Sequence, residues 1–290
     1  MIRTEDLRAI CNRTQKRRKV RDYVARGVLL LASLFLYAPI IAVLGYVVVS
    51  GIRHVNLAVF TQLPMPVGEA GGGVGNGIAG TGLLLAMALG IGAPWGVLIG
   101  LYLSESKNTR VSSAVRFAAD LLTSVPSIVI GLTVYELVVV PMGHFSAFAG
   151  SVALGIIMTP SVARTTEDLL RMVPISVREA GLALGLPRWR VTLLIVLRSA
   201  KKGVVTAILI AVARVAGETA PLLFTAFGSR FWSTNPLEPT AALPLQIYNY
   251  SISPFEDWHH KAWASAFVLI VFVSLISFTA RIFFRLGDKA

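Results

Sequence analysis

Two residues of opposite charge, Arg214 and Glu218, lie inside the long apolar stretch Gly203–Gly228. An arginine near the centre of a membrane helix costs roughly 2.5–3.5 kcal/mol on insertion scales, so it usually faces a partner or a water-filled path. The planar guanidinium presents a fork of donors that suits phosphate and related oxyanions. One interpretation is therefore an anion path, in which Glu218 holds the guanidinium of Arg214 in place.

The same spacing permits a purely structural interpretation. Residues four apart are neighbours on one helix face, so an ion pair between Arg214 and Glu218 would lower the cost of burying both. Arg before Glu is the less favourable order, however, and a desolvated pair rarely improves on apolar residues. Gly217 and Pro221 predict a helix that is kinked just past the charges, an arrangement typical of transporters.

A second set of polar residues has helical spacing. Asp120, Ser124 and Ser127 fall on one face of a predicted helix that Pro126 interrupts. Small and polar residues of this kind either pack against a neighbouring helix or line a path. Both interpretations of this stripe stay open.

The sequence lacks the motifs that carry catalysis. It has no G-x-x-x-x-G-K-S/T phosphate loop and no H-E-x-x-H motif, and its four histidines show no metal-ligand spacing. Gly75, Gly77 and Gly80 match the dinucleotide fingerprint, but no strand is predicted before them. Flexibility and close helix packing explain these glycines better. We predict a non-catalytic chain with no metal site and no cofactor of its own.

The composition is that of a membrane protein. Hydrophobic residues make up 55% of the chain and charged residues 14%, and the mean hydropathy is +0.70. About 20 apolar residues in a helix cross a bilayer, and helices satisfy the backbone there. We therefore predict an all-α, polytopic membrane protein with six transmembrane helices. The predicted spans are Gly27–Gly51, Gly77–Leu103, Phe117–Val140, Phe145–Ala163, Gly203–Gly228 and Ala262–Ala280.

The 27 basic residues divide unevenly between the two sides of the membrane. The two tails, the link between the second and third spans, and the link between the fourth and fifth spans together carry 23 of them. The three loops on the other side carry three, and Arg214 lies within a span. Cytoplasmic loops collect Lys and Arg, so we expect both termini to be cytoplasmic. The basic tail, residues 1–26, is then a topology signal with a second role in contacting anionic lipid, and no nucleic-acid partner is expected.

Three connections of the predicted transmembrane domain, residues 27–285, are long enough to have a function of their own: the external loops 52–76 and 229–261 and the cytoplasmic segment 164–202. The cytoplasmic segment 164–202 contains two amphipathic pieces around Pro187, which breaks a helix. These pieces suit either the membrane surface or a soluble partner. The external loop 229–261 is rich in Trp, Tyr and Pro and suits the docking of an external protein. A short cytoplasmic tail, residues 286–290, ends the chain.

One segment of the cytoplasmic connection resembles the permeases of binding-protein-dependent ABC importers. Glu179, Ala180, Gly181 and Gly185 match the loop pattern E-A-A-x3-G of that family, with Gly181 in place of the second Ala. The full family pattern is E-A-A-x3-G-x9-I-x-L-P. Ile195 and Leu197 match it at the expected spacing, and Arg198 replaces the final Pro. The resemblance implies the type I ABC importer permease fold, with a short cytoplasmic coupling helix that docks into an ATPase subunit.

Two further stretches resemble the phosphate-specific members of this family. They are Arg164-Thr165-Thr166-Glu167 and ARVAGETAPLLFTAF, residues 213–227. The resemblance implies a phosphate path that includes Arg164, Arg214 and Glu218. It also implies a second permease subunit, an ATPase dimer that binds ATP and Mg²⁺, an external phosphate-binding protein, and a place in a prokaryotic plasma membrane.

Two other functions compete with phosphate import at this point. The docking pattern fits a permease for another oxyanion, such as sulfate or molybdate, equally well. An ion-coupled secondary transporter would use Asp120, Glu136 and Glu218 as proton or cation sites. No pair of broken segments at matching places in two halves of the sequence favours the latter.

Overall fold

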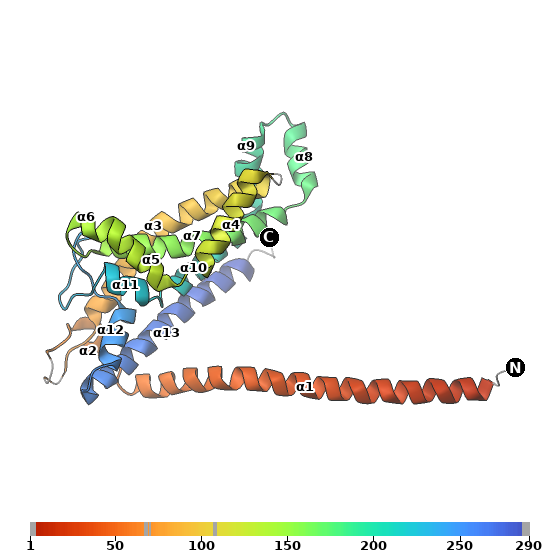
Figure 1. Cartoon of the computed structure of the whole chain (residues 1–290), viewed down its shortest axis with the longest axis horizontal. Helices are drawn as coiled ribbons and strands as arrows, with labels where there is room; N and C mark the ends of the chain where they lie inside the picture. Colours follow the sequence, from red (N-terminus) through yellow and green to blue (C-terminus); the bar gives the residue numbers. More distant parts are fainter. Residues whose placement is uncertain (1–3, 67–68, 70, 107–108, 286–290) are drawn as a thin grey trace. The chain divides into compact units, whose positions relative to one another are not determined.

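The structure, a computed structural model, describes residues 4–66, 69, 71–106 and 109–285. These residues are helical or irregular, apart from one isolated bridge between Phe227 and Thr240 (Figure 1). The predicted C-terminal tail, residues 286–290, lies outside the described residues. The helices are α1 (Thr4–Ile52), α2 (Leu57–Thr61), α3 (Gly75–Glu105), α4 (Arg110–Ser124), α5 (Ser127–Val134), α6 (Val140–Met142), α7 (Ala147–Arg171), α8 (Ile175–Ala183), α9 (Arg188–Arg190), α10 (Leu197–Val215), α11 (Ala220–Thr225), α12 (Leu243–Ser251) and α13 (Glu256–Arg285), with π-helical turns at Tyr135–Val139 and Val191–Val196.

The chain divides into two compact units, residues 1–50 and 51–290. The described residues of the first unit all belong to α1, which ends two residues beyond this unit. The part of α1 from Arg21 to Ile52 is long and apolar enough to cross a membrane. Residues 4–26, which the sequence predicts as a tail, form the start of the same helix.

The second unit is built around the packing of α3 against α7. Gly92, Gly96 and Gly100 recur at every fourth residue of α3 and form one stripe along the helix. A Cβ atom at Gly96 would lie 2.6 Å from the Cβ of Val162, and one at Gly100 would lie 2.7 Å from the carbonyl oxygen of Ala163. Small residues at this spacing let the two helix backbones approach closely.

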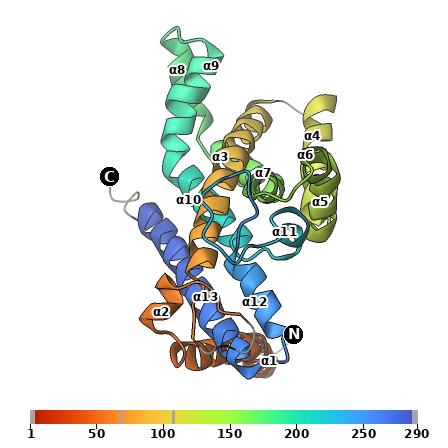
Figure 2. The same cartoon turned by 90° about the vertical axis from the view of Figure 1, so that its left-hand side faces the viewer.

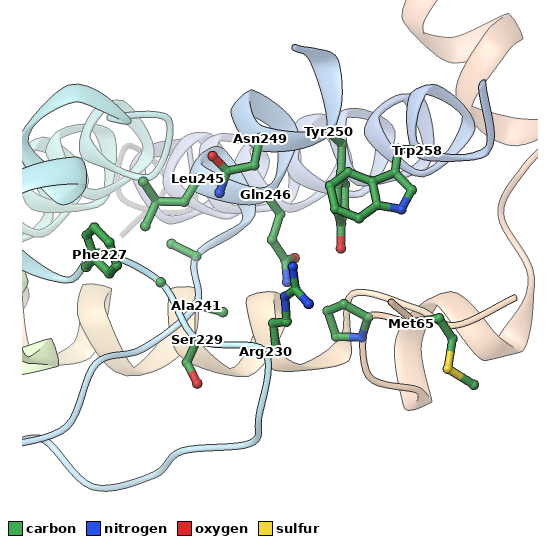
Figure 3. Close-up of a pocket in the computed structure, with 13 residues that line it drawn as sticks. Met65, Phe227, Ser229, Arg230, Ala241, Leu245, Gln246, Asn249, Tyr250 and Trp258 are labelled. Atoms are coloured by element: carbon green, nitrogen blue, oxygen red, sulfur yellow. The ribbon is translucent and has the colours of Figure 1, made fainter. Parts of the chain in front are cut away.

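The glycine-rich start of α3 packs against α12 and the chain before it. Gly77 lies on the side-chain amide of Gln246 and Gly80 on the backbone of Ala241, with no room for a Cβ at either glycine. The Nε2 of Gln246 donates to the Oδ1 of Asn76 at 2.9 Å, and Figure 3 shows Gln246 extending from α12 toward Arg230. The lack of room for a Cβ at these glycines confirms the prediction of close helix packing.

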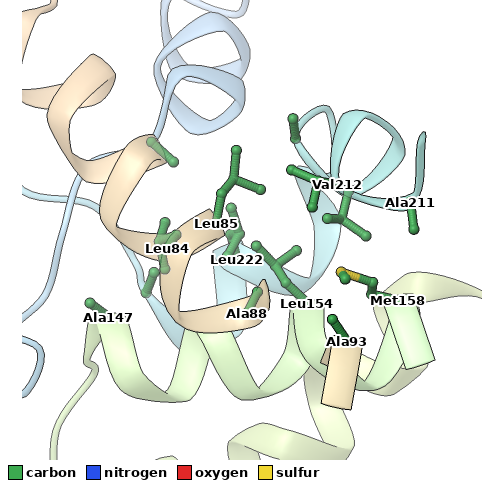
Figure 4. Packing of buried hydrophobic residues seen from close by; sticks show 14 of the residues in the cluster. Leu84, Leu85, Ala88, Ala93, Ala147, Leu154, Met158, Ala211, Val212 and Leu222 are labelled. Atoms are coloured by element: carbon green, nitrogen blue, oxygen red, sulfur yellow. The ribbon is translucent and has the colours of Figure 1, made fainter. Parts of the chain in front are cut away.

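Apolar side chains from α3, α7, α10 and α11 form the main core of the second unit (Figure 4). Leu84 and Ala88 of α3 meet Leu154 and Met158 of α7, and Leu222 of α11 packs into the same cluster. All five are at most 2% exposed. This core holds the short α11 in place beside the end of α10.

Four helices of the described residues, α1, α3, α7 and α13, are long and apolar enough to cross a membrane. A fifth span is added if the bent helices from Arg110 to Met142 count as one. The bend there is 102° and separates α4 from α5. Pro126 explains it, because proline disfavours a helical conformation in the preceding residue, and Val125 is extended, with φ −68° and ψ 131°.

The predicted span Gly203–Gly228 is not one continuous helix. Helix α10 ends at Val215 and α11 begins at Ala220. The break therefore covers residues 216–219, so it begins after Arg214 and contains Glu218, and Gly217 weakens the helix there. The sequence predicts a kink just past both charges, and this position is wrong, because the helix already ends at Val215, before Glu218.

Helices α8 and α9 project from one end of the second unit (Figures 1 and 2). They lie within the predicted cytoplasmic segment 164–202. Helix α7 continues into this segment through Arg171, and α10 begins within it at Leu197. Helix α12 lies toward the opposite end of the same unit (Figure 1).

Candidate functional site

Two adjoining cavities open among α4, α5, α7 and α10. The larger has a volume of about 570 Å³ and the smaller about 150 Å³. Thr123, Ser161 and Arg214 line both. The shared walls make Arg214 the junction between the two cavities.

The structure brings the polar residues singled out in the sequence to these cavities. The larger cavity is lined by four of them, Asp120, Ser124, Arg164 and Arg214. The smaller is lined by Ser127 and Glu218 together with Arg214. Residues from four separate helices and from the break after α10 therefore share one polar hollow.

Arg214 lies in the last turn of α10. Its Nη1 donates to the Oγ of Ser161 at 3.3 Å, and the ion pairs of the described residues include none between Arg214 and Glu218. The helix ends before Glu218, so the four-residue spacing does not bring the two charges together. A cation in the last helical turn is instead favoured by the helix dipole. Two interpretations are therefore wrong: the purely structural intrahelical pair, and the pair in which Glu218 holds the guanidinium of Arg214 in place.

Arg164 makes a two-pronged ion pair with Asp120, 44 residues away in the sequence. Its Nη2 lies 2.5 Å from both carboxylate oxygens of Asp120, and its Nε donates to Oδ1 at 3.0 Å. The side chains remain partly open to the cavity, at 36% exposure for Arg164 and 57% for Asp120. Paired donors on a carboxylate are the strong form of this interaction.

Glu167 is a buried carboxylate surrounded by three arginines, and sequence reasoning assigned it no role. Its side chain is 3% exposed. Its Oε1 lies 2.8 Å from Arg116 Nε and 2.8 Å from Arg171 Nη2, and its Oε2 lies 3.4 Å from Arg164 Nη1. A buried charge needs such partners, because desolvation otherwise costs several kcal/mol.

The sequence held part of the signal for this cluster. Arg164, Glu167 and Arg171 are spaced three and four apart, so they share one helix face. The third partner, Arg116, comes from α4 and could not be found by spacing. Its Nη2 also donates to the carbonyl oxygen of Leu103 at 3.1 Å, which ties the cluster to the end of α3.

Helix α8 carries the predicted ATPase-docking residues. Glu179 and Ala180 are exposed, whereas Gly181 is buried against the turn Val191–Val196. A Cβ at Gly181 would lie 2.8 Å from the Cδ1 of Ile195. This contact gives a physical reason for glycine where the family pattern has alanine.

Gly185 ends the turn after α8 in a left-handed conformation. Its φ is +79°, and a Cβ there would meet open space. Glycine is favoured at this position because L side chains rarely adopt such a φ. The neighbouring Leu184 is 80% exposed, so the turn presents an apolar tip.

Arg178 joins α8 to the rest of the second unit. It forms an ion pair with Glu105 at the end of α3, and its Nη2 donates to the carbonyl oxygen of Leu170 at 2.9 Å. Burial lowers the pKa of Arg178 from its ordinary value. Helix α8 is therefore attached to α3 and α7 near the Glu167 cluster.

A family model and similar proteins of known name agree on the family of this chain. The model of the binding-protein-dependent transport system inner membrane component family matches residues 92–290. The phosphate transport system permease protein PstA of Yersinia pestis is 43% identical over 268 residues, which are 92% of this chain and 91% of that protein. The PstA protein of Xylella fastidiosa (strain 9a5c) is 44% identical over 92% of this chain and 93% of its own length.

Solved structures of ABC transporters share the fold. A chain of the MetNI methionine ABC transporter in an inward-facing conformation matches with a TM-score of 0.60 and 22% identity, over 74% of this chain and 94% of that chain. A chain of an amino acid ABC transporter matches with a TM-score of 0.54 and 17% identity, over 73% and 92%. The helical arrangement is thus that of these ABC transporter chains.

Proposed function

Because the chain belongs to the PstA permeases, within the family of binding-protein-dependent inner membrane components, we propose that its two adjoining cavities form one wall of a phosphate path. The chain is the non-catalytic permease component of a phosphate ABC transporter. In this family ATP hydrolysis takes place on a separate subunit.

The main support for a phosphate path is the position of Arg214 and the hydrogen bond that its guanidinium makes. Its guanidinium lies at the junction of the two cavities and donates to a neutral hydroxyl, that of Ser161. A guanidinium without a carboxylate partner keeps its donors available for an oxyanion. Glu218 also lines the smaller cavity, and its negative charge keeps the binding of phosphate weak, since a conducting site must also release its ion.

We propose six membrane crossings for the chain. Helices α1, α3, α7 and α13 account for four, the bent helices from Arg110 to Met142 for the fifth, and α10 with α11 for the sixth. An even number agrees with the basic residues on both tails and alternate connections, which place both termini in the cytoplasm. Residues 27–285 then form one transmembrane domain.

We propose α8 and the turn after it as the coupling helix. Glu179, Ala180, Gly181 and Gly185 lie on the projecting part of the second unit (Figure 2). Ile175 and Leu184 are 71% and 80% exposed there, and exposed apolar side chains of this kind suit a partner surface. The partner is an ATPase dimer of the PstB type, which binds ATP and Mg²⁺.

Two more partners complete the proposed transporter. A second permease subunit of the PstC type supplies the opposite wall of the path. An external phosphate-binding protein meets the loop 229–261, whose residues line most of a cavity of about 400 Å³ (Figure 3). Arg230 and Trp258 lie on the walls of this cavity.

Radiolabelled phosphate uptake tests the path. Cells without their own high-affinity permease receive the partner subunits with the wild-type chain, Arg214→Gln, or Arg281→Gln as a matched control outside both cavities. We expect uptake with the wild type and the control and none with Arg214→Gln, with all three chains present in the membrane. Undiminished uptake by Arg214→Gln would refute the path, and import of sulfate or molybdate without phosphate would refute the substrate.

A further inference from the structure

The two arginines of the larger cavity, Arg164 and Arg214, differ in the groups to which they donate hydrogen bonds. Arg214 donates to a hydroxyl, whereas the Nε and Nη2 of Arg164 are both directed at the carboxylate of Asp120. Both arginines line the same cavity as Asp120. An anion in this cavity would therefore meet one available guanidinium and one that is already occupied.

The carboxylate of Asp120 occupies the place that an oxyanion would take. A guanidinium binds carboxylate and phosphate through the same pair of parallel donors. Asp120 is more than half exposed, so the aspartate does not need this contact to avoid an unpaired buried charge. Water can therefore take the place of this ion pair, although its two-pronged geometry makes it stronger than an ordinary surface pair.

Arg164 is anchored independently of Asp120. Its Nη1 lies 3.4 Å from the Oε2 of Glu167, a buried residue of the same helix that is also paired with Arg116 and Arg171. Asp120 belongs to α4, a different element. A swing of the Asp120 side chain toward water, or a movement of the part of α4 that follows Arg116, would thus remove the carboxylate, keep Arg116 on Glu167 and leave the guanidinium of Arg164 where it is.

Contacts link α4 to the projecting helix α8. Arg116 of α4 donates to the carbonyl oxygen of Leu103 near the end of α3, and Glu105 in the last turn of α3 pairs with Arg178 of α8. The three elements meet at the end of the unit that carries α8. A displacement of α8 would therefore act on α4 through these contacts with the end of α3.

We infer that Asp120 is a releasable internal counter-ion, which fills the fork of Arg164 when the cavity is empty and is displaced by the transported oxyanion. The inference rests on the proposed function. Its consequence is a path that holds phosphate weakly while Asp120 is in the position seen here. When Asp120 moves away, Arg164 joins Arg214 in binding the ion, and the return of Asp120 drives release.

Equilibrium binding of radiolabelled phosphate to the purified full transporter in nanodiscs, without the external binding protein, tests this role. The variants are Asp120→Asn, Asp120→Glu and, as a matched control, Asp168→Asn, an exposed carboxylate of α7 that does not line either cavity. We expect Asp120→Asn to bind phosphate at least about tenfold more tightly, because Arg164 loses its internal competitor. Asp120→Glu and Asp168→Asn should stay near the wild type.

The double variant Asp120→Asn with Arg164→Gln separates competition from a structural effect. If Asp120 competes for Arg164, the gain in affinity disappears in the double variant. The uptake rate of Asp120→Asn should also fall while its apparent KM falls, since release is slowed. Equal affinity of Asp120→Asn and Asp168→Asn, or a gain that survives loss of Arg164, would overturn the inference.

Two outcomes separate this inference from the proposed function. Uptake of phosphate by the wild type with unchanged binding by Asp120→Asn refutes the counter-ion and leaves the permease assignment intact. Absence of both phosphate uptake and phosphate binding in the wild type refutes the phosphate path itself. If Asp120→Asn does not assemble, Asp120→Ala and Asp120→Ser take its place, and failure of all three overturns the inference, because the aspartate would then serve the fold.

Discussion

The buried carboxylate of Glu167 should be the most sensitive single charge for the stability of the second unit. Replacing it by glutamine keeps the side-chain size and removes the negative charge that faces Arg116, Arg164 and Arg171. Removing one partner of a buried ion pair typically costs about 3–5 kcal/mol, because the other charge is left uncompensated.

The exposure of the three arginines places the expected loss at the lower end of that range. Arg116 is 16% exposed, whereas Arg164 and Arg171 are 36% and 49% exposed, so water can replace part of the lost interaction for the latter two. Arg164 also keeps Asp120. We expect a loss of about 3 kcal/mol for Glu167→Gln, which corresponds to a fall in Tm of about 6–12 °C for a chain of this size.

Thermal unfolding of the purified transporter, followed by tryptophan fluorescence, measures this loss. The matched control is Asp168→Asn, which removes a carboxylate from the next residue of the same helix, where the side chain is exposed. Exposed substitutions usually change stability by about 0.5 kcal/mol or less. If Glu167→Gln unfolds within about 2 °C of Asp168→Asn, the arginines do not depend on Glu167, and the reasoning from burial is refuted.

Three further predictions concern packing, backbone conformation and pH. Gly96→Ala should destabilise the transporter by about 1–3 kcal/mol through overpacking, since its Cβ would lie 2.6 Å from that of Val162; thermal unfolding checks this, and Gly90→Ala on the same helix, which meets open space, should not differ from the wild type. Gly185→Ala should reduce substrate-stimulated ATPase activity in the full complex, because alanine disfavours φ +79°; Gly143→Ala has a similar φ of +73° and open space and should leave that activity unchanged. Burial raises the pKa of Tyr250 to about 12, above the ordinary value near 10, so its neutral phenol contributes stability that is present below about pH 10 and lost as the pH rises through 12. Tyr250→Phe should remove that loss and the last step of the tyrosinate absorbance titration; an unchanged titration above pH 11 would contradict the assignment.

Much of the architecture follows from local patterns. Apolar stretches of membrane length predict the helices α1, α3, α7 and α13, because in lipid a helix satisfies its own backbone hydrogen bonds whatever its neighbours are. The interruption at Pro126 is also a local property of the residue. The bend of 102° that follows from it is not, since its size depends on how α4 and α5 each pack against α7.

The contacts among the charged residues of the site were harder to predict than the identity of those residues. The sequence by itself determined that Arg214, Glu218, Arg164 and Asp120 would be charges within or beside membrane helices, and hence that they needed water, a partner or a path. Tertiary structure decided which charges meet. The break after Val215 separates Arg214 from Glu218, and packing across 44 residues joins Arg164 to Asp120. Spacing along one helix reports only neighbours on that helix, while ion pairs between helices depend on how the helices are placed, and that placement is set by the glycine and apolar contacts of the whole unit.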